Sequence, residues 1–397
     1  MYNFLLAFAI CAAIVMIGEL VDRKTHAWIP SVFVSAVLFL VGYWTILPQT
    51  LVKDTLLFPF GATVAIFLLI THLGTIISLR RLIDQWKTVI SCLAGLFGMC
   101  VLAYFIGPML MDRALVIAGL PPLTGGIIAA TMMQKAAADA GLVAASVFAI
   151  TMYCIQGFAG YPLTAIALKK EAARLIEAYR RGEEKIDASE LAAAQTVLSE
   201  EPVAAKRLPL QLPEKWNTST VVLGKLAIVA WGAMMLGKYT GISGAIWALV
   251  LGVVFCTLGF LDRNALNKSN SFGICMFALV LYVFEGLKDC SPQMLGELIG
   301  PMIMLIVMGV AGMAAMAFVA SLVLRRSFSI TFANCLTALY GFPFDQIITI
   351  STIDSVAKNK DEHAFLMSKM FPSMIVGGFV TVTITSVFIA GIFAKMF

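Results

Sequence analysis

Polar residues that could bind a small charged solute are concentrated in two stretches of this chain, 122–141 and 336–358. Each stretch is weakly apolar, rich in glycine, threonine and alanine, and contains charged side chains. At membrane depth, irregular backbone persists only inside protein or beside water. Polar segments interrupted by glycine or proline, at matching places in two halves of a chain, are typical of the binding site of a secondary transporter.

The side chains in these stretches can contact a charged solute and a coupling ion. The sequence Gly341-Phe342-Pro343 cannot continue as an undisturbed helix, because Pro343 has no backbone donor and clashes with the preceding turn. A helix broken there exposes carbonyls that can hold a cation and amides that can hold a carboxylate. The predicted substrate-binding residues are Thr131, Gln134, Lys135, Asp139, Tyr340, Asp345, Thr349 and Thr352. The predicted ion-binding residues are Gly341, Ser351, Asp354 and His72, with Na⁺ as the possible ion and no other metal or cofactor.

Some of these residues have a second interpretation. Lys135 and Asp139 are four apart, as are Asp354 and Lys358, so each pair can neutralise itself and anchor a hairpin. Lys135 can instead bind an anionic substrate or replace a coupling cation. His72 fits either a proton relay or a hydrogen-bonded core histidine.

Motifs of enzymes are missing from the sequence. It contains no HExxH, GxSxG, P-loop or Rossmann glycine pattern. Its 3 histidines make a histidine-based metal centre an unlikely design, and no nucleophile–base pair is visible. We therefore expect a protein that is not an enzyme.

Composition places the chain in a membrane. Of its 397 residues 60% are hydrophobic and 13% charged, with a mean hydropathy of +0.92. Soluble domains carry roughly 25% charged residues. The net charge of +5 is spread over short loops, so nucleic acid is not an expected partner. The 8 cysteines lack paired spacing and fit small buried residues.

Apolar runs predict ten membrane spans, since a crossing takes about 20 helical residues. They cover 4–21, 28–47, 58–77, 88–109, 142–168, 221–237, 244–261, 270–287, 298–324 and 364–393. The two halves align at an offset of about 212 residues, which pairs Phe60-Gly61 with Phe272-Gly273. The predicted fold is all-α and polytopic, with two inverted repeats of five transmembrane helices. A re-entrant or broken helix, 117–141 or 328–358, precedes the fifth helix of each. The predicted domains are the repeats 1–168 and 221–397, joined by the linker 169–220.

Basic residues predict the orientation. Most of the 28 Lys and Arg fall in one set of loops, which includes the central segment 169–215. The positive-inside rule then places the central loop in the cytoplasm and both termini outside. We expect a multi-pass protein of the plasma membrane, in bacteria the inner membrane.

Several short motifs resemble the sodium:glutamate symporter (ESS) family and its relatives in the bile-acid-type elevator superfamily. They are Ile29-Pro30, the run Leu73-Gly74-Thr75-Ile76-Ile77-Ser78-Leu79-Arg80, Pro122-Leu123-X-Gly125, and the run from Gly341-Phe342 to Pro372 that includes Thr349. The resemblance implies a homodimeric elevator transporter with a mobile core, and sodium-coupled uptake of a small carboxylate. Lys135–Asp139 stands where the family has a GGHGT-type motif, and Pro343 and Asp345 replace glycines of its second loop.

The sequence thus predicts a secondary active transporter for a small organic anion or amino acid, coupled to Na⁺ or H⁺. Its expected partners are that small molecule, the lipid bilayer and a second copy of the chain. One alternative is an exporter or a cation-independent carrier of the same fold. An alternative of another class is a membrane sensor or scaffold that signals through segment 169–215.

Overall fold

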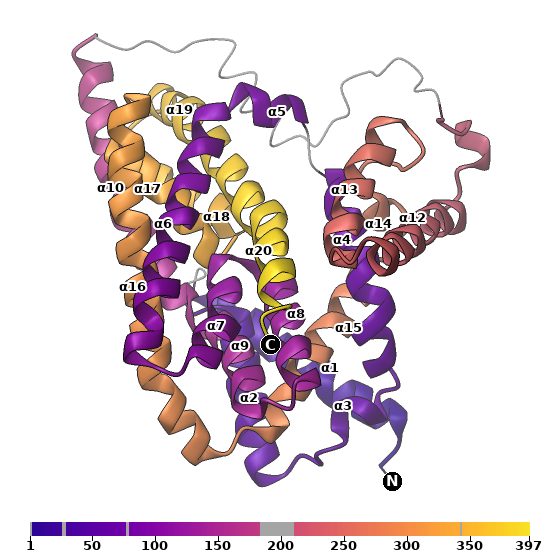
Figure 1. Ribbon diagram of the computed structural model, residues 1–397. Coiled ribbons are helices and arrows are strands. Elements are labelled where there is room, and N and C mark those ends of the chain that lie inside the picture. The colour runs from indigo at the N-terminus through magenta and orange to yellow at the C-terminus, as the bar shows by residue number, and fades with distance from the viewer. Residues whose placement is uncertain (1, 26–28, 77–78, 183–209, 342–343) are drawn as a thin grey trace.

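The computed structural model describes residues 2–25, 29–76, 79–182, 210–341 and 344–397, and over these ranges it is helical without a β-strand (Figure 1). Within them 6 helical segments are long and apolar enough to cross a membrane. They are α1 (Phe4–Lys24), α6 (Trp86–Leu110), Val143–Arg180, α12 (Ser219–Thr240), α16 (Pro292–Leu324) and Lys360–Phe393. The prediction of an all-α polytopic membrane protein is confirmed.

Shorter elements complete the first half of the chain. These are α2 (Ser31–Thr45), α3 (Leu51–Asp54), the π-helix η1 (Phe60–Ala65), α4 (Ile66–Ile76), α5 (Leu79–Asp84), α7 (Arg113–Thr124), α8 (Gly126–Asp139), α9 (Val143–Ile155) and α10 (Gly157–Arg180). The predicted re-entrant stretch 117–141 is therefore a helical hairpin, α7–α8, which bends at Gly125. Helix α10 extends the fifth predicted span into the linker as far as Arg180.

The second half of the chain contains a further set of short elements. It contains η2 (Glu214–Trp216), α13 (Gly244–Thr257), α14 (Ala265–Lys268), α15 (Phe272–Glu285), η3 (Gly286–Asp289), α17 (Phe328–Leu336), η4 (Thr337–Leu339), α18 (Phe344–Val356), α19 (Lys360–Gly378), the π-helix η5 (Phe379–Thr385) and α20 (Ser386–Phe393). The second hairpin is α17–η4–α18. Pro343, predicted to break it, lies outside the described residues, as does most of the linker, 183–209. The inverted orientation of the halves stays a prediction.

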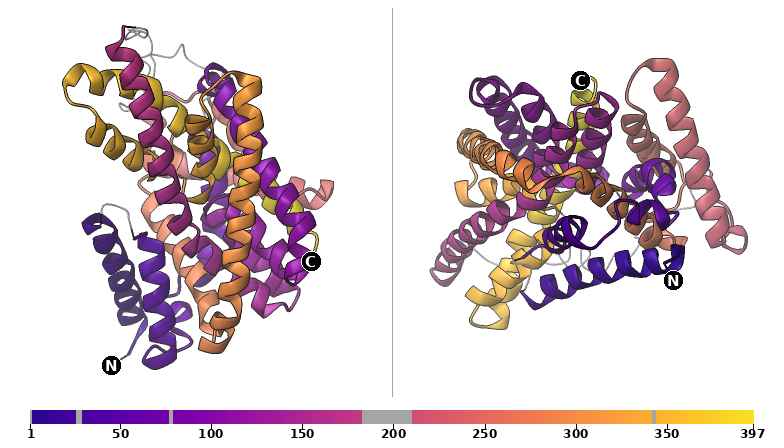
Figure 2. Two further views of the ribbon diagram at one scale, coloured as in Figure 1. Left: turned by 90° about the vertical axis from the view of Figure 1, so that its left-hand side faces the viewer. Right: turned by 90° about the horizontal axis from the view of Figure 1, so that it is seen from below.

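The helices pack into two main groups. The core bundle comprises α6–α10 and α16–α20, and the side bundle comprises α4 and α12–α15. The side bundle stands beside the core in Figure 1 and in the right-hand view of Figure 2, which is seen from below. Helix α6 crosses α16 where Gly98 meets Gly312, and a Cβ on Gly98 would clash with the carbonyl oxygen of Gly312. Small residues allow such close crossings in membrane proteins. In the side bundle, a Cβ on Gly74 of α4 would lie 2.6 Å from the carbonyl oxygen of Leu249 in α13.

Contacts between the bundles use other helices. Helix α8 contacts α15, α9 contacts η3, and α20 contacts α13. Helix α2, which pairs with α1 and contacts α9 and η3, lies against both bundles (Figure 2). Each bundle therefore contains a close helix crossing of its own. The two bundles contact each other at other places than these crossings.

Each hairpin of the core is held by the last helix of the other half. Helix α10 packs against α17 and α18, whereas α20 packs against α7 and α8. This exchange buries both hairpins inside the bundle and brings together segments that are far apart in sequence.

One end of the core bundle, here called the linker end, carries the end of α10, α5, the end of α16 and the start of α19 (upper part of Figure 1). An ion pair joins α10 to the start of α19, and a hydrogen bond joins α10 to the turn after α16. Arg180 Nη2 lies 2.8 Å from Glu362 Oε1, and Glu171 accepts hydrogen bonds from Arg174 Nη2 at 2.7 Å and Ser327 Oγ at 2.5 Å.

Candidate functional site

The backbone breaks of the two hairpins meet at one residue, Val382 of η5. Gly125, Gly126 and Gly341 have φ angles of 137°, 81° and 69°, which side chains rarely adopt. A Cβ on Gly341 would lie 2.5 Å from Val382 Cγ2, and one on Gly126 would lie 2.8 Å from Val382 Cγ1. A Cβ on Gly125 would lie 2.9 Å from Val382 Cα. Glycine at these positions thus gives both the bend and the close approach.

The segment that carries Val382 is itself irregular. The π-helix η5 interrupts the long helix α19–α20, and π-bulges are frequent at functional sites. The hydroxyl of Thr381 donates to the carbonyl oxygen of Gly377 at 3.0 Å, and that of Thr385 donates to Val380 O at 2.8 Å. Three irregular segments, two from hairpins and one from a long helix, therefore converge inside the core.

Asp345, at the start of α18, is a fully buried carboxylate with an unused acceptor. Its exposed fraction is 0%, its Oδ1 accepts from the Gln346 backbone N–H at 2.8 Å, and its Oδ2 has no partner among the described residues. It lies within electrostatic reach of Tyr340 and Tyr161, whose rings stack with centroids 5.0 Å apart. Asp345 has no ion-pair partner among the described residues, and a buried negative charge is expensive unless a proton or a cation neutralises it.

Tyr340 is held firmly beside this carboxylate. Its hydroxyl donates to Thr164 Oγ1 of α10 at 3.1 Å, and a Cβ on Gly160 would lie 2.8 Å from its ring. Helix α10, which belongs to the first half of the chain, therefore packs against the bend of the second hairpin.

The remaining predicted residues of α18 fall on both sides of the helix. Thr349 and Thr352 are buried, and Thr349 Oγ1 donates to Asp345 O at 2.6 Å. Ser351 and Asp354 are exposed. Asp354 Oδ1 lies 3.1 Å from His363 Nε2, while the Lys358 backbone N–H donates to Glu362 Oε2. The expected Asp354–Lys358 pair is therefore replaced by contacts with the start of α19.

In the first hairpin, the uncharged polar residues are buried and the charged ones are not. Thr131 is fully buried, with its hydroxyl 2.8 Å from Ile128 O, and Gln134 Nε2 lies 3.4 Å from Tyr282 O. Lys135 and Asp139 are exposed, and no ion pair in the described residues joins them to each other or to Asp345. The neutralising pair proposed from their spacing is not formed.

His72 lies in the side bundle, away from the hairpins. It is fully buried between α4, α14 and α15; its Nδ1 accepts from the Leu266 backbone N–H at 3.2 Å, and its ring lies 5.5 Å from that of Phe272. This environment matches the core histidine that the sequence also allowed. The structure does not bring His72 to Gly341 or Asp345.

A line of buried polar residues that sequence reasoning did not select runs beside the second hairpin. Asn334 has an exposed fraction of 0% and accepts at Oδ1 from Ser373 Oγ at 3.1 Å, while its Nδ2 has no partner among the described residues. Its carbonyl accepts from Thr337 Oγ1 at 2.6 Å, and Thr337 Oγ1 lies 3.2 Å from Thr381 Oγ1. In the sequence, Asn334 is a single amide within an apolar run, and this isolation is the one feature that could have marked it as a candidate site residue.

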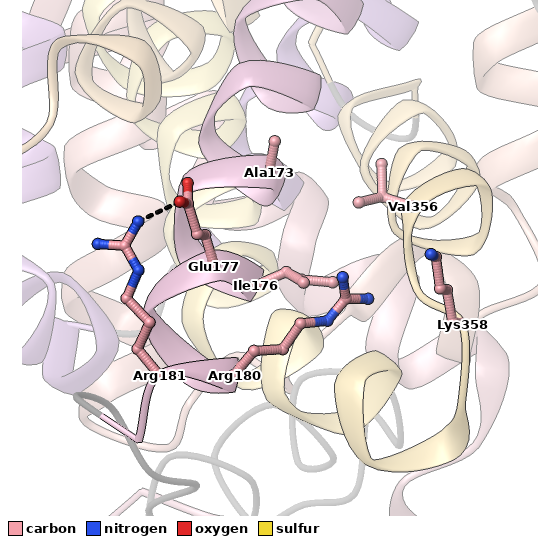
Figure 3. A pocket seen from close by; sticks show the side chains of 7 residues that line it. All are labelled: Ala173, Ile176, Glu177, Arg180, Arg181, Val356 and Lys358. Carbon is pink, nitrogen blue, oxygen red and sulfur yellow. Dashed lines mark hydrogen bonds and ion pairs between the residues drawn. The ribbon is translucent and has the colours of Figure 1, made fainter.

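Cavities in the described residues lie at the linker end. One of about 380 Å³ lies between α10 and the end of α18 (Figure 3). Glu177 there pairs with Arg181, and Arg180 points across the cavity on the side of Lys358. Arg180 and Arg181 are each paired with a carboxylate, Glu362 and Glu177, which leaves Lys358 as the remaining cation of this lining. The second cavity, of about 330 Å³, lies between α6 and α19.

Metal binding by clustered side chains is not indicated: the described residues contain no group of three or more His, Cys, Asp or Glu that could hold a metal. A hard cation such as Na⁺ prefers oxygen ligands, and Asp345 Oδ2 is a buried oxygen without a hydrogen-bond partner among the described residues. Comparison with known proteins finds no family model that matches this chain and no curated protein that matches it.

Proposed function

We propose that this multi-pass membrane protein is a secondary active transporter for a small organic anion or zwitterion such as a carboxylate or amino acid. The observation that carries the proposal is the convergence of both hairpin breaks on Val382, together with the buried carboxylate of Asp345 at the start of α18, whose Oδ2 has no partner among the described residues. Broken helices that meet inside a bundle leave carbonyls and amides free for a solute and an ion.

Asp345 is the proposed coupling group. Burial of its negative charge without a partner favours the state that holds a cation, either Na⁺ or H⁺. Binding of that cation also changes the local charge that a solute carboxylate meets. Uptake of an anion is thereby linked to the cation, which is the requirement for symport.

The two bundles support an elevator mechanism. The core bundle contains both hairpins, and its helices α6 and α16 cross in close contact. In the side bundle the close crossing is that of α4 and α13. We propose that the core moves relative to the side bundle and carries the site across the membrane. A homodimer held by the side bundles, the plasma membrane as location and a cytoplasmic linker end are part of this proposal.

Transport in proteoliposomes tests the proposal. Labelled carboxylates and amino acids are offered under an inward Na⁺ gradient, an inward H⁺ gradient or neither, with protein-free liposomes as the blank. We expect at least one solute to accumulate under one gradient. Asp345→Asn should abolish this accumulation, while the matched change Asp354→Asn on the exposed side of α18 should preserve it. Accumulation by Asp345→Asn at the wild-type rate would remove Asp345 from the coupling role.

A shortened linker separates a carrier from a sensor. Deletion of residues 185–205 removes part of the segment through which a sensor would signal. A carrier keeps its flux after this deletion. A chain that moves none of the offered solutes under any gradient, but loses a cellular response when the linker is shortened, would instead be a sensor.

A further inference from the structure

The second cavity, between the start of α6, the α16–α17 turn and α19, has a positively charged rim. Lys87, Arg326 and Lys369 line it, with Asp84 as the opposing carboxylate. Arg326 is fixed by a hydrogen bond from its Nη1 to Thr88 Oγ1 at 2.9 Å. Three cationic groups against one carboxylate give the cavity an attraction for anions.

The floor of this cavity is polar. Ser368 and Ser373 of α19 line it with exposed fractions of 4% and 3%, and Ser373 Oγ donates to Asn334 Oδ1. Five helical residues separate the two serines, which places them about 7 Å apart along the axis. Ser373 therefore lies deeper from the linker end than Ser368.

Behind the floor, the Asn334 amide has a donor to spare. Its Nδ2 is buried without a partner among the described residues. Buried donors in folded proteins nearly always have an acceptor, from protein, water or ligand. An anionic oxygen is the strongest acceptor for such an N–H group.

From Asn334 the polar contacts continue to the hairpin breaks. Thr337 bonds to the Asn334 carbonyl and approaches Thr381, which precedes Val382 in η5. A series of polar contacts, through side chains and the Asn334 carbonyl, therefore connects the cavity to the breaks.

We propose that this cavity is the anion entrance of the transporter at its linker end, and that the Asn334 amide donates a hydrogen bond to a carboxylate or phosphate oxygen of the solute. The inference rests on the proposed transport function and names a route and a positioning residue for it. An anionic lipid headgroup has the same chemistry as the solute. The solute is favoured because the polar contacts run inward to the breaks.

Cysteine labelling with reagents of opposite charge tests the entrance. Ser368→Cys and Ser373→Cys are made singly in the full chain and exposed to an anionic sulfonatoethyl or a cationic trimethylammonioethyl methanethiosulfonate. Peptide mass spectrometry follows each site separately from the native cysteines. For each cysteine, the rate of labelling by the anionic reagent is divided by the rate with the cationic reagent, and this ratio is divided by the same ratio for free mercaptoethanol. At low salt the result should be at least about ten. It should fall towards one at about 1 M salt.

Three substitutions assign the preference for the anionic reagent to named groups. In the Ser368→Cys protein, Lys87→Gln should lower the ratio severalfold. Asn334→Asp should lower it as well, since the new carboxylate keeps the size of the amide and removes its donor; Asn334→Ala should lower it less. A ratio equal to that of the free thiol, or no labelling of either cysteine, would overturn the entrance. An unchanged ratio in Asn334→Asp would remove Asn334 from it.

The lipid alternative and the transport proposal have separate readouts. Labelling is repeated in vesicles of phosphatidylcholine alone and with phosphatidylglycerol; equal rates support a solute route, whereas protection by phosphatidylglycerol would assign the cavity to lipid. Labelling needs no flux. An anion preference without flux would therefore contradict the transporter alone, and flux without an anion preference would contradict the entrance alone.

Discussion

Neutralising Asp345 should remove the dependence of the free energy of unfolding on the concentration of the coupling ion. The wild-type carboxylate is fully buried with a free Oδ2, so a bound cation is held by the folded state and not by the unfolded chain. A ligand at 100 times its dissociation constant stabilises the fold by about 2.7 kcal/mol. Asp345→Asn keeps the shape and removes the charge, so this gain should disappear.

The expected shift in melting temperature follows from the size of the chain. An unfolding entropy of about 2.1 cal/mol/K per residue gives roughly 0.8 kcal/mol/K for 397 residues. Saturating sodium should therefore raise the wild-type Tm by about 3 °C. In choline chloride Asp345→Asn should melt above the wild type, because it no longer buries an unpaired charge.

Differential scanning fluorimetry in detergent measures both effects. Sodium chloride is titrated against choline chloride at pH 8, and Asp354→Asn serves as the control with an exposed carboxylate on the same helix. If the ion is a proton, the same comparison is made in choline chloride between pH 8 and pH 6. The reasoning is refuted if Asp345→Asn keeps the wild-type ion response, or if Asp354→Asn loses it.

Further predictions concern the parts that hold the site in place. Asp262→Asn should lower the free energy of unfolding by about 3 kcal/mol, because the side chain of Lys225 loses its counter-charge; that side chain is 8% exposed and lies 2.5 Å from the carboxylate. The double variant Asp262→Asn with Lys225→Met should melt at a higher temperature than Asp262→Asn alone. A lower Tm of the double variant would contradict this prediction. Glu362→Gln should lower the Tm, because Arg180 loses the carboxylate that lies 2.8 Å away and the Lys358 backbone N–H loses a charged acceptor; a Tm equal to that of the wild type would refute it. Gly98→Ala should destabilise the fold by about 1–3 kcal/mol, because the added methyl group forces α6 away from α16. Gly232→Ala is the control: a Cβ there meets open space, so the fold should not be destabilised. Equal thermal stability of the two variants would contradict the close crossing of α6 and α16.

The fold class and the hairpins could be predicted from the sequence, because each depends on local features. Long apolar runs predict spans, and glycines within polar stretches mark where a re-entrant segment bends; the bends occur at Gly125 and Gly341. The extension of α10 to Arg180 also follows from its local charge pattern. Such signals need no knowledge of the partner helix.

Side-chain placement could not be predicted in the same way. Lys135 was assigned to the site because a charge in a membrane segment defaults to function, yet it lies on the exposed side of α8. His72 has no neighbours in sequence that reveal its hydrogen bond from Leu266. Asn334 acquires its importance from Ser373 and Thr381, which approach only when α19 and η5 fold against α17 and η4. These contacts are long-range, and a single sequence carries no record of them.

The most direct test of the central claim, that both hairpins form one transport site, is the flux of Val382→Trp. A bulky ring at the point where Gly125, Gly126 and Gly341 converge should abolish uptake in proteoliposomes. Val319→Trp makes the same change at a residue of α16 that is 47% exposed, and should leave uptake intact. Equal uptake by the two variants, both folded by size-exclusion chromatography, would contradict the account.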